Sequence, residues 1–254
     1  MSETVDLPHV YELITCEVID SAVAEARRLA LAGAEEGTLV RAQEQTAAHD
    51  LFGQPQPSPR GNLYACLILR PECTTAVAQQ LVYLSTISLG LTIAGLASPM
   101  TDLRYRWPNV VLLNGAATGE SALEPGPEKA GTLEWLLLGL TVNVNNLPVT
   151  CDINITSLQS EGLAQASATD VLYGFSRHFL SGINRWAGIG FAPTRKAWTL
   201  RLDGLGNIQE IHLKDETLTG KLVELDEHGA LVLELEGGTR RHVTVADFFG
   251  IPGG

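Results

Sequence analysis

The chain has 254 residues, of which 45% are hydrophobic and 18% charged, so it can bury a large core. Its formal net charge is −12 at pH 7. A chain this acidic lacks the basic patch that nonspecific binding to nucleic acid or an anionic membrane requires, so small molecules or carrier proteins are the expected partners.

The N-terminal part predicts alternating strands and one helix. Residues 10–18 are typical of a strand, and "DSAVAEARRLALAG" predicts a helix that Asp20 or Ser21 caps and Gly33 ends. The segments "GTLVRAQE" and "LYACLILR" predict two further strands.

The connection between those two strands, "QTAAHDLFGQPQPSPRGNLY" (residues 45–64), is unusually long. It contains three prolines and no lysine or arginine before Arg60. A loop of this length inside a domain is usually a binding or lid loop, or else a disordered connection. Its prolines predict restricted motion.

Residues 73–101 contain no charged residue and are long enough to span a bilayer. Gln79, Gln80 and several serines, threonines and glycines dilute the apolar run, which also lacks basic or aromatic flanks. We therefore expect a fully buried helix that ends before Pro99, and no membrane span.

The rest of the chain completes an α+β pattern. "LRYRWPNVVLLNG" predicts two strands broken at Pro108, "LEWLLLGLTVNVNN" a central strand, and "ATDVLYGFSRHFLSGINRWA" an amphipathic helix. From about Trp198, alternating residues with glycine turns predict a small antiparallel barrel or sandwich. The expected organisation is a mixed β-sheet with helices at residues 10–192 and a small β module at residues 198–250.

The cysteines, at positions 16, 66, 73 and 151, form no C-x-x-C pair and have no histidine at metal-ligand spacing. This predicts no metal site and a reducing compartment. The N-terminal residues lack the features of a secretory signal. A cytoplasmic location is therefore expected.

Five segments stand out in order along the chain: "DSAVAEARRLALAGAEEGTLVRAQEQTA", "SPRGNLYACLILRP", "RWPNVVLLNG", "WLLLGLTVNVNNLP" with the later "TSL", and "TLTGKLVELDEHGALVLELEGGT". Together, over about residues 12–250, they resemble the biotin/lipoate protein ligase family, and specifically its biotin-protein ligase branch. The resemblance implies a class II synthetase-like catalytic domain followed by an SH3-like β-barrel. It also implies that biotin and ATP form biotinyl-adenylate, whose acyl group passes to a lysine of a carrier domain.

The cations that this chemistry requires are largely replaced. Joining a carboxylate to a triphosphate needs cations and backbone donors that offset the repulsion. The family's R-G-R-x-G-R loop falls on "HDLFGQ", where only Gly53 matches, and the family's active-site lysine falls near Ala116 or Ala117. The family's K-W-P-N-D hairpin reads "RWPNV". The sequence therefore predicts an eroded adenylation site with weak or no ligation.

The uncharged residues that line the family's pocket are matched better than its charged residues are. The resemblance implies that ligand-binding positions are Ser21, Gln45, Asn62, Tyr64, Arg106, Trp107, Asn109, Gly119 and Asn143. Some of these residues could instead have purely structural roles. Tyr64 and Trp107 would then be core aromatics, Asn109 a turn former and Asn143 a hydrogen-bond partner of the backbone. The expected ligand is a small acyl or adenylate-like molecule, or a biotin or lipoyl carrier domain. The resemblance implies biotin and ATP as ligands, whereas the charged residues that are present do not.

Two other hypotheses remain. A divergent but active carrier-protein ligase or transferase would use Arg106 or Cys151 in place of the lysine. No histidine or lysine adjoins Cys151 to lower its thiol pKa, so a loop or buried cysteine is the simpler interpretation. The third hypothesis is a structural or regulatory protein that forms a homodimer through its sheet.

Overall fold

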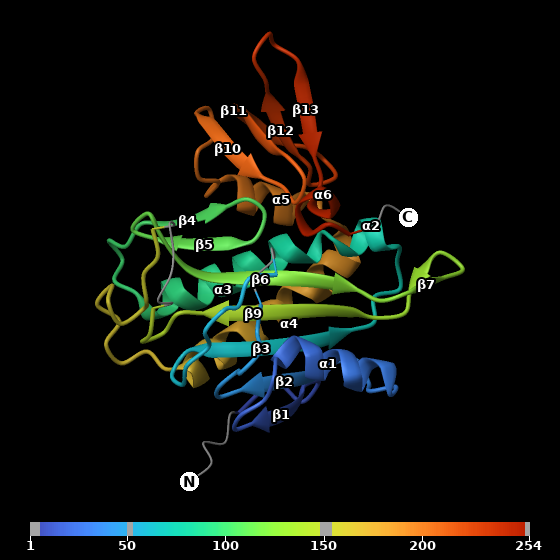
Figure 1. Cartoon of the computed structure of the whole chain (residues 1–254), viewed down its shortest axis with the longest axis vertical. Helices are drawn as coiled ribbons and strands as arrows, with labels where there is room; N and C mark the ends of the chain where they lie inside the picture. Colours follow the sequence, from blue (N-terminus) through green and yellow to red (C-terminus); the bar gives the residue numbers. More distant parts are fainter. Residues whose placement is uncertain (1–5, 50–52, 148–153, 252–254) are drawn as a thin grey trace.

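A computed structural model describes residues 6–49, 53–147 and 154–251 of the chain. Its main element is a seven-stranded sheet in the order β1-β2-β3-β9-β6-β5-β4 (Figure 1). The strands of this sheet are β1 Glu12–Cys16, β2 Thr38–Ala42, β3 Leu63–Leu69, β4 Leu103–Arg106, β5 Val110–Leu113, β6 Ala116–Pro125 and β9 Leu136–Val142. β1 pairs with β2 in parallel and every other pair in the sheet is antiparallel, so the expected mixed sheet is confirmed.

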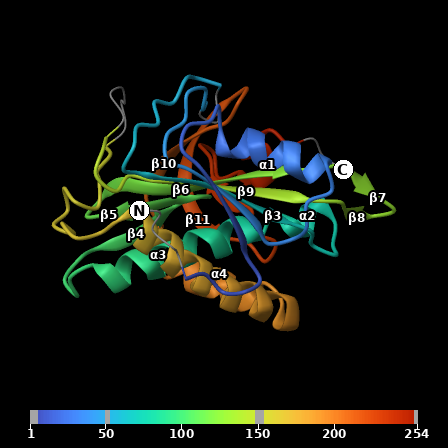
Figure 2. The same cartoon turned by 90° about the horizontal axis from the view of Figure 1, so that it is seen from below.

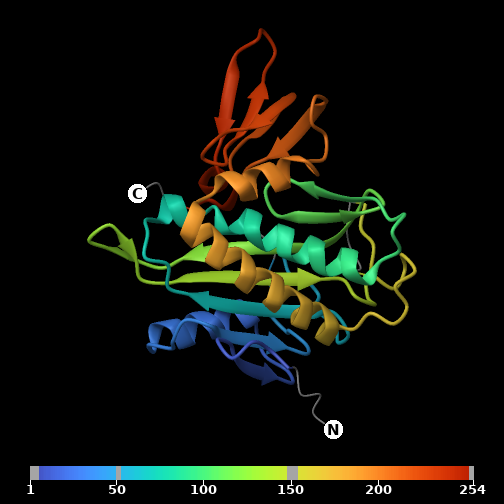
Figure 3. The ribbon, with the colours of Figure 1, turned by 180° about the vertical axis from the view of Figure 1, so that it is seen from behind.

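Helices cover the two faces of the sheet unequally (Figure 2). α1 (Ala22–Leu31) packs on β2, β3 and β9 on one face, whereas α3 (Leu81–Leu96) and α4 (Ala168–Ile189) cover the other (Figure 3). The central strand β9 is apolar almost throughout because it is covered on both sides.

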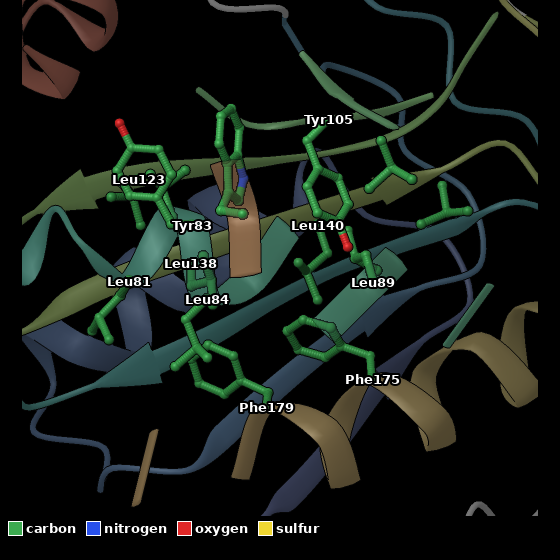
Figure 4. Close-up of a cluster of buried hydrophobic side chains, with 14 of the residues drawn as sticks. Leu81, Tyr83, Leu84, Leu89, Tyr105, Leu123, Leu138, Leu140, Phe175 and Phe179 are labelled. Atoms are coloured by element: carbon green, nitrogen blue, oxygen red, sulfur yellow. The ribbon is translucent and has the colours of Figure 1, made fainter. Parts of the chain in front are cut away.

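The larger core lies between the sheet and the pair α3 and α4. α4 is amphipathic as expected, with its buried residues at helical spacing, and a capping box between Ser167 and Asp170 starts it. Phe175 and Phe179 stack with ring centroids 5.3 Å apart and face leucines of α3 and the sheet (Figure 4).

The uncharged segment forms a short helix, α2 (Thr75–Ala78), and then α3. By length and composition alone Thr75–Leu96 could cross a membrane, yet 67% of its most apolar window is buried in the fold. α3 is buried on most of its circumference, and the hydroxyls of Thr86, Ser88 and Thr92 donate to carbonyls one turn earlier, as Thr86 does to Val82 (2.8 Å). The helix ends before Pro99 as predicted, but it is not fully buried, because Leu91 is 48% and Leu96 40% exposed.

The C-terminal part is a four-stranded antiparallel sheet, in agreement with the expected small β module. Its strands are β10 Ile208–His212, β11 Thr217–Leu225, β12 Leu231–Glu234 and β13 Arg240–Val243, followed by α6 Val245–Phe249. α5 (Ala192–Thr199), with Pro193 in its first turn, leads into it and packs against α3 and β11. The division of the chain at residues 192 and 198 stays a prediction. A two-stranded ribbon, β7 Glu128–Lys129 with β8 Thr132–Leu133, completes the fold.

Candidate functional site

One row of paired residues crosses six strands on the face of the sheet that carries α1. Its members are Ala42, Tyr64, Thr141, Glu120, Val110 and Arg106, from β2, β3, β9, β6, β5 and β4. Directly opposed residues of antiparallel strands project to the same face, so these six side chains share one surface, which we call the site row.

The half of the site row toward β4 is the accessible half. α1 packs over β2, β3 and β9, and Val23 of α1 approaches Gly139 of β9. Ala42 and Tyr64 are therefore buried, whereas Thr141, Glu120, Val110 and Arg106 are half-buried, and Ala122 beside Glu120 is exposed. This half of the row is where a ligand can reach the sheet.

The described parts of the long loop, residues 45–49 and 53–64, lie over this face, in light blue in Figure 1. His49 pairs with Pro55, and the Gln56 N–H donates to the carbonyl of Ala48 (2.8 Å), so the described parts of the loop run antiparallel. The Gln56 amide donates to Glu120 Oε1 (3.3 Å). The loop therefore contacts the site row through the amide of Gln56. Its expected restricted motion stays a prediction.

Ser21 and Gln45 together cap α1. Ser21 Oγ accepts a hydrogen bond from the Ala24 N–H (3.4 Å), and Gln45 Oε1 accepts one from the Ala22 N–H (2.8 Å). Gln45 Nε2 donates to Ser58 Oγ (3.1 Å), which closes the base of the loop. Of the two caps expected from the sequence, Ser21 is the N-cap residue. Both side chains stabilise backbone, and their expected ligand contacts stay predictions.

Asn62 organises the segment that follows β9. Its Oδ1 accepts hydrogen bonds from the N–H groups of Val144 (3.0 Å), Asn145 (3.2 Å) and Asn146 (3.1 Å), and its Nδ2 donates to the Asn146 carbonyl (3.0 Å). These hydrogen bonds hold the loop in place, so the Asn62 amide has few donor or acceptor positions left for a ligand.

Asn143 is half-buried, and alternation along the strand gives it the same face as Thr141. Its backbone N–H donates to the Thr118 carbonyl (2.8 Å). Tyr64 is 3% exposed, and its hydroxyl donates to the Pro59 carbonyl (3.1 Å). Burial raises the pKa of Tyr64, so the hydroxyl stays a neutral donor.

Trp107 and Gly119 lie toward the other side of the sheet. The Trp107 indole N–H donates to the hydroxyl of Tyr83 in α3 (2.7 Å), and its ring meets Phe248 edge-on at 5.4 Å. A Cβ on Gly119 would meet Val142, which is part of the core under α3 and α4. These contacts are those of core residues, and the ligand role expected for both positions stays a prediction.

Asn109 lies in the turn between β4 and β5, next to the cis peptide Trp107–Pro108. Its Nδ2 donates to the Ser121 carbonyl (2.7 Å), which fits the turn-forming interpretation. Its Oδ1 is buried without a partner among the described residues, as are Thr118 Oγ1 and Ser121 Oγ. Unpaired buried polar atoms are uncommon, and this hairpin has more of them than its own hydrogen bonds satisfy.

Most arginines near the site row are engaged by acids. Arg60 bonds to Glu17 (2.9 Å) and Glu44 (3.3 Å), Arg104 to Asp102 (3.0 Å), and Arg27 to Glu124 (2.5 Å). Arg106 shares its face of β4 with Arg104, but it is half-buried and makes no ion pair with a described residue. Arg106 is therefore the cation of the site row.

The structure offers no activated thiol among the described cysteines. Cys66 is buried, and burial raises the pKa of its thiol; burial also raises the pKa of Cys16, with Glu25 adding to the effect. Cys151 lies outside the described residues. The described part of the chain also contains no group of three histidine, cysteine or acidic side chains that could hold a metal ion.

Glu120 is the site residue that sequence reasoning missed. It lies three positions beyond Ala117 in the segment "AATGESALE". The sequence shows that this segment lacks the family's lysine, but it does not show that Glu120 belongs to the site. A bulge between Val111 and Leu112 shifts the β5–β6 register and leaves Thr118 unpaired, which sets Glu120 opposite Val110. Only the long-range pairing of β6 with β9 and β5 puts this acid at the centre of the row.

Two hollows among the described residues lie away from this surface. One of about 250 Å³ lies between α3 and α4 and is lined by residues such as Leu91, Tyr173 and His178. The other, of about 120 Å³, lies near Pro99 and Arg201. The site row itself offers one carboxylate, one guanidinium, hydroxyls and amides, a set suited to binding a polar ligand.

Comparison with known proteins gives consistent matches along the chain. The model of the biotin/lipoate A/B protein ligase family matches residues 7–200, and that of the biotin protein ligase C-terminal domain matches residues 209–249. The bifunctional ligase/repressor BirA of Bacillus subtilis is 28% identical over 90% of this chain and 71% of its own length. A biotin–[acetyl-CoA-carboxylase] ligase of Paracoccus denitrificans is 27% identical over 91% of this chain and 98% of its own length.

Two solved structures share the fold. A biotin protein ligase-like protein of unknown function from Silicibacter sp. TM1040 superposes with a TM-score of 0.79 and 21% identity, covering 95% of this chain and 97% of that one. The biotin protein ligase of Aquifex aeolicus in complex with biotin and ATP gives a TM-score of 0.76 and 20% identity, covering 93% and 97%.

Proposed function

Since the chain belongs to the biotin/lipoate A/B protein ligase family, we propose that it is a biotin-protein ligase-like protein with an eroded adenylation site. In this proposal it binds a small acyl or adenylate-like ligand, or a biotin or lipoyl carrier domain, and joins them weakly or not at all. A cytoplasmic location and a homodimer remain predictions of the same hypothesis.

The position of Glu120 is the observation that carries this proposal. A carboxylate at the centre of the site row opposes the approach of both substrates of an adenylation, a carboxylate and a triphosphate. Even about 1.4 kcal/mol is a tenfold change in rate or affinity.

The ion pairs nearby support the same conclusion. Arg60 and Arg104, which would be candidates to replace the missing cations, are each bound by a surface acid. Drawing either arginine to a phosphate would mean giving up that pair. The surface pairs themselves contribute little stability, so the larger obstacle is the acidic surroundings that the phosphate would enter.

A ligation assay tests the proposal directly. Pure protein is incubated with biotin, magnesium ATP and a biotin carboxyl carrier domain, with an active biotin protein ligase as positive control. We expect no streptavidin-shifted carrier band, or a rate at least a thousandfold below that of the control. A band that forms at a rate comparable to the control would overturn the eroded site.

Arg106 favours a second candidate, a divergent but active acyl-carrier ligase or transferase. It is the half-buried cation of the site row, so an acyl phosphate lying along the row would meet it. In that case Arg106→Gln abolishes carrier acylation, with biotin, lipoate or octanoyl-carrier donors, while Arg104→Gln leaves it unchanged. If Cys151 is instead the acceptor, a hydroxylamine-labile acyl adduct forms and is lost in Cys151→Ser.

A further inference from the structure

We propose that the hollow between α3 and α4 binds a small primary amine with an apolar body, and that Asp170 binds its ammonium group. The helices α3 and α4 cover one face of the main sheet, whereas the site row lies on the face that carries α1 (Figure 3). The inference therefore goes beyond the proposed function, because it concerns a second ligand site on the other side of the molecule.

The hollow exists because the two helices touch closely at one point and leave space beside it. A Cβ at Gly174 of α4 would lie 2.6 Å from Thr92 of α3, so the helices approach there as closely as a glycine allows. A Cβ at Gly95, one turn further along α3, would meet nothing of the described chain within 4 Å beyond its own helix backbone. The resulting volume of about 250 Å³ suits a ligand smaller than a drug-sized molecule.

The walls of this hollow are apolar side chains that are partly exposed. Leu91 and Leu96 of α3 are 48% and 40% exposed, and Tyr173 of α4 is 37% exposed. The Arg177 guanidinium lies over the Tyr173 ring, 5.5 Å from its centroid, and donates to the Tyr173 hydroxyl (3.2 Å), which holds the ring in place. Apolar side chains gathered around one hollow mark a binding site more than scattered ones do, and an apolar ligand body would cover all three.

The charge of the lining selects the head group of the ligand. Asp170 is the acidic residue of the lining, and within the described chain no lysine or arginine lines the hollow. Asp170 Oδ2 accepts the hydrogen bonds of the capping box, from the Ser167 N–H (3.0 Å) and hydroxyl (2.7 Å). Its Oδ1 accepts none from a described residue, so an ammonium group can bind this oxygen without breaking the cap.

The position of Arg177 is compatible with a cationic ligand. It lies seven residues after Asp170 in α4, which is about 10 Å along the helix axis. An ammonium group at Asp170 is therefore closer to the carboxylate than to the guanidinium.

Other ligand classes use less of the hollow. A carboxylate with the same apolar body would bring a second negative charge to Asp170, and a neutral alcohol would cover the walls without pairing with the acid. Because Asp170 is exposed, its ion pair is weak alone, and we expect a preference of several fold on top of the affinity that the apolar body supplies.

Nuclear magnetic resonance titrations of the isotope-labelled full chain test this inference. The probes are 2-phenylethylamine, which is charged at pH 7 as lysine is, and its matched counterparts 2-phenylethanol and 3-phenylpropanoate. Each is added up to about 20 mM, because ligands of this size bind weakly. We expect 2-phenylethylamine to shift the amide signals of residues 91–96 and 170–178, and to bind at least about fivefold more tightly than the alcohol and the acid.

Four variants separate the volume of the hollow from its charge. Gly95→Leu fills the hollow and should abolish binding, whereas Gly188→Leu, at an exposed glycine of α4 that also has open space around it, should not change it. Asp170→Asn should remove the preference for the amine over the alcohol. Asp170→Glu keeps both the charge and a residue that can close the capping box, so it should retain the preference.

Circular dichroism and thermal melts confirm that each variant is folded. Equal binding of the three probes, or no shift of these signals by 2-phenylethylamine at about 20 mM, would overturn the inference. Undiminished binding in a folded Gly95→Leu variant, or a preference for the amine that persists in folded Asp170→Asn, would overturn it as well. The ligation assay reports on the opposite face of the sheet, so its outcome is independent of these.

Discussion

Tyr83 is a single residue that joins three parts of the molecule. It lies in α3 with no exposed surface, accepts a hydrogen bond from the indole of Trp107 (2.7 Å), and donates one to the carbonyl of Gly229 in the C-terminal module. Its ring lies 5.5 Å from Phe191 and meets Trp198 edge-on at 5.2 Å. Burial raises the pKa of Tyr83, which keeps the hydroxyl protonated and able to serve both neighbours.

Removing the Tyr83 hydroxyl should lower the free energy of unfolding by much, although the change removes one atom. Tyr83→Phe leaves the Trp107 N–H and the Gly229 carbonyl without their partner, and an unsatisfied buried polar group costs about 1 to 3 kcal/mol. We expect a loss of about 2 to 4 kcal/mol in the free energy of unfolding, measured by urea denaturation. Tyr173→Phe on the exposed face of α4 is the matched control and should change it by less than about 0.5 kcal/mol. Equal effects of the two changes would contradict the role given to Tyr83.

At the scale of single elements, α1 depends on a residue outside itself. The N–H of Ala22, in its first turn, is satisfied by the side chain of Gln45, which arrives from the loop after β2. The loop and the helix therefore hold each other in place at the edge of the site row.

Substitutions at Gln45 should separate capping from loop closure. Gln45→Ala removes both hydrogen bonds and should destabilise the protein by about 1 to 2 kcal/mol. Gln45→Glu keeps the acceptor for Ala22, next to the positive end of the helix, and should lose less than half as much. Urea denaturation gives the totals, and amide hydrogen exchange in α1 shows whether its first turn opens. A larger loss in the glutamate variant would show that the contact with Ser58, and not the cap, is what matters.

Local patterns made most elements predictable, but they did not predict how the elements pair. Ser21 and Gly33 bound the first helix as expected, because capping of a helix depends on local side chains and local backbone conformation. The place of Glu120 depends on β6 pairing with β9 and on a bulge at Thr118, which are long-range choices with no local signal. The fold was therefore within reach of sequence reasoning, while the charge of the site face was not.

At the scale of the whole molecule, the C-terminal module is fastened to the main sheet at the hairpin that carries Arg106. Trp107 packs on Phe248 of α6, and Tyr83 bonds to Gly229 in the loop between β11 and β12. That loop is held by Asp226, whose carboxylate accepts hydrogen bonds from the N–H groups of His228 (3.0 Å) and Ala230 (2.9 Å) and contacts His242 (2.9 Å).

Asp226 should make the stability of the protein sensitive to acid. Burial alone would raise its pKa, but the hydrogen bonds with His242 and the two backbone donors outweigh burial and lower it. A lowered carboxyl pKa stabilises the folded state above about pH 4, and this contribution is lost as pH falls through the folded-state pKa. We expect Asp226→Asn to lose about 1 to 3 kcal/mol at pH 7 and to show a flatter decline between pH 5 and 3 in urea denaturation.

The control for this prediction is Asp215→Asn, on an exposed turn of the same module. It should leave both the stability at pH 7 and the slope of the acid decline within about 0.5 kcal/mol of the unmodified chain. An unchanged acid slope in Asp226→Asn would mean that other carboxylates, such as Glu128, whose pKa the Thr75 backbone N–H lowers, govern acid unfolding.

The apolar helix α3 has a consequence for how the protein is made. The elements that pack on it, from β4 to α5, all follow it in the chain, and α4 ends 93 residues after α3 does. At a translation rate of about 5 to 20 residues per second, the helix waits roughly 5 to 19 s on the ribosome before its cover is complete. During that interval an uncharged, apolar segment lacks the elements that cover it in the fold, and slower synthesis lengthens its exposure.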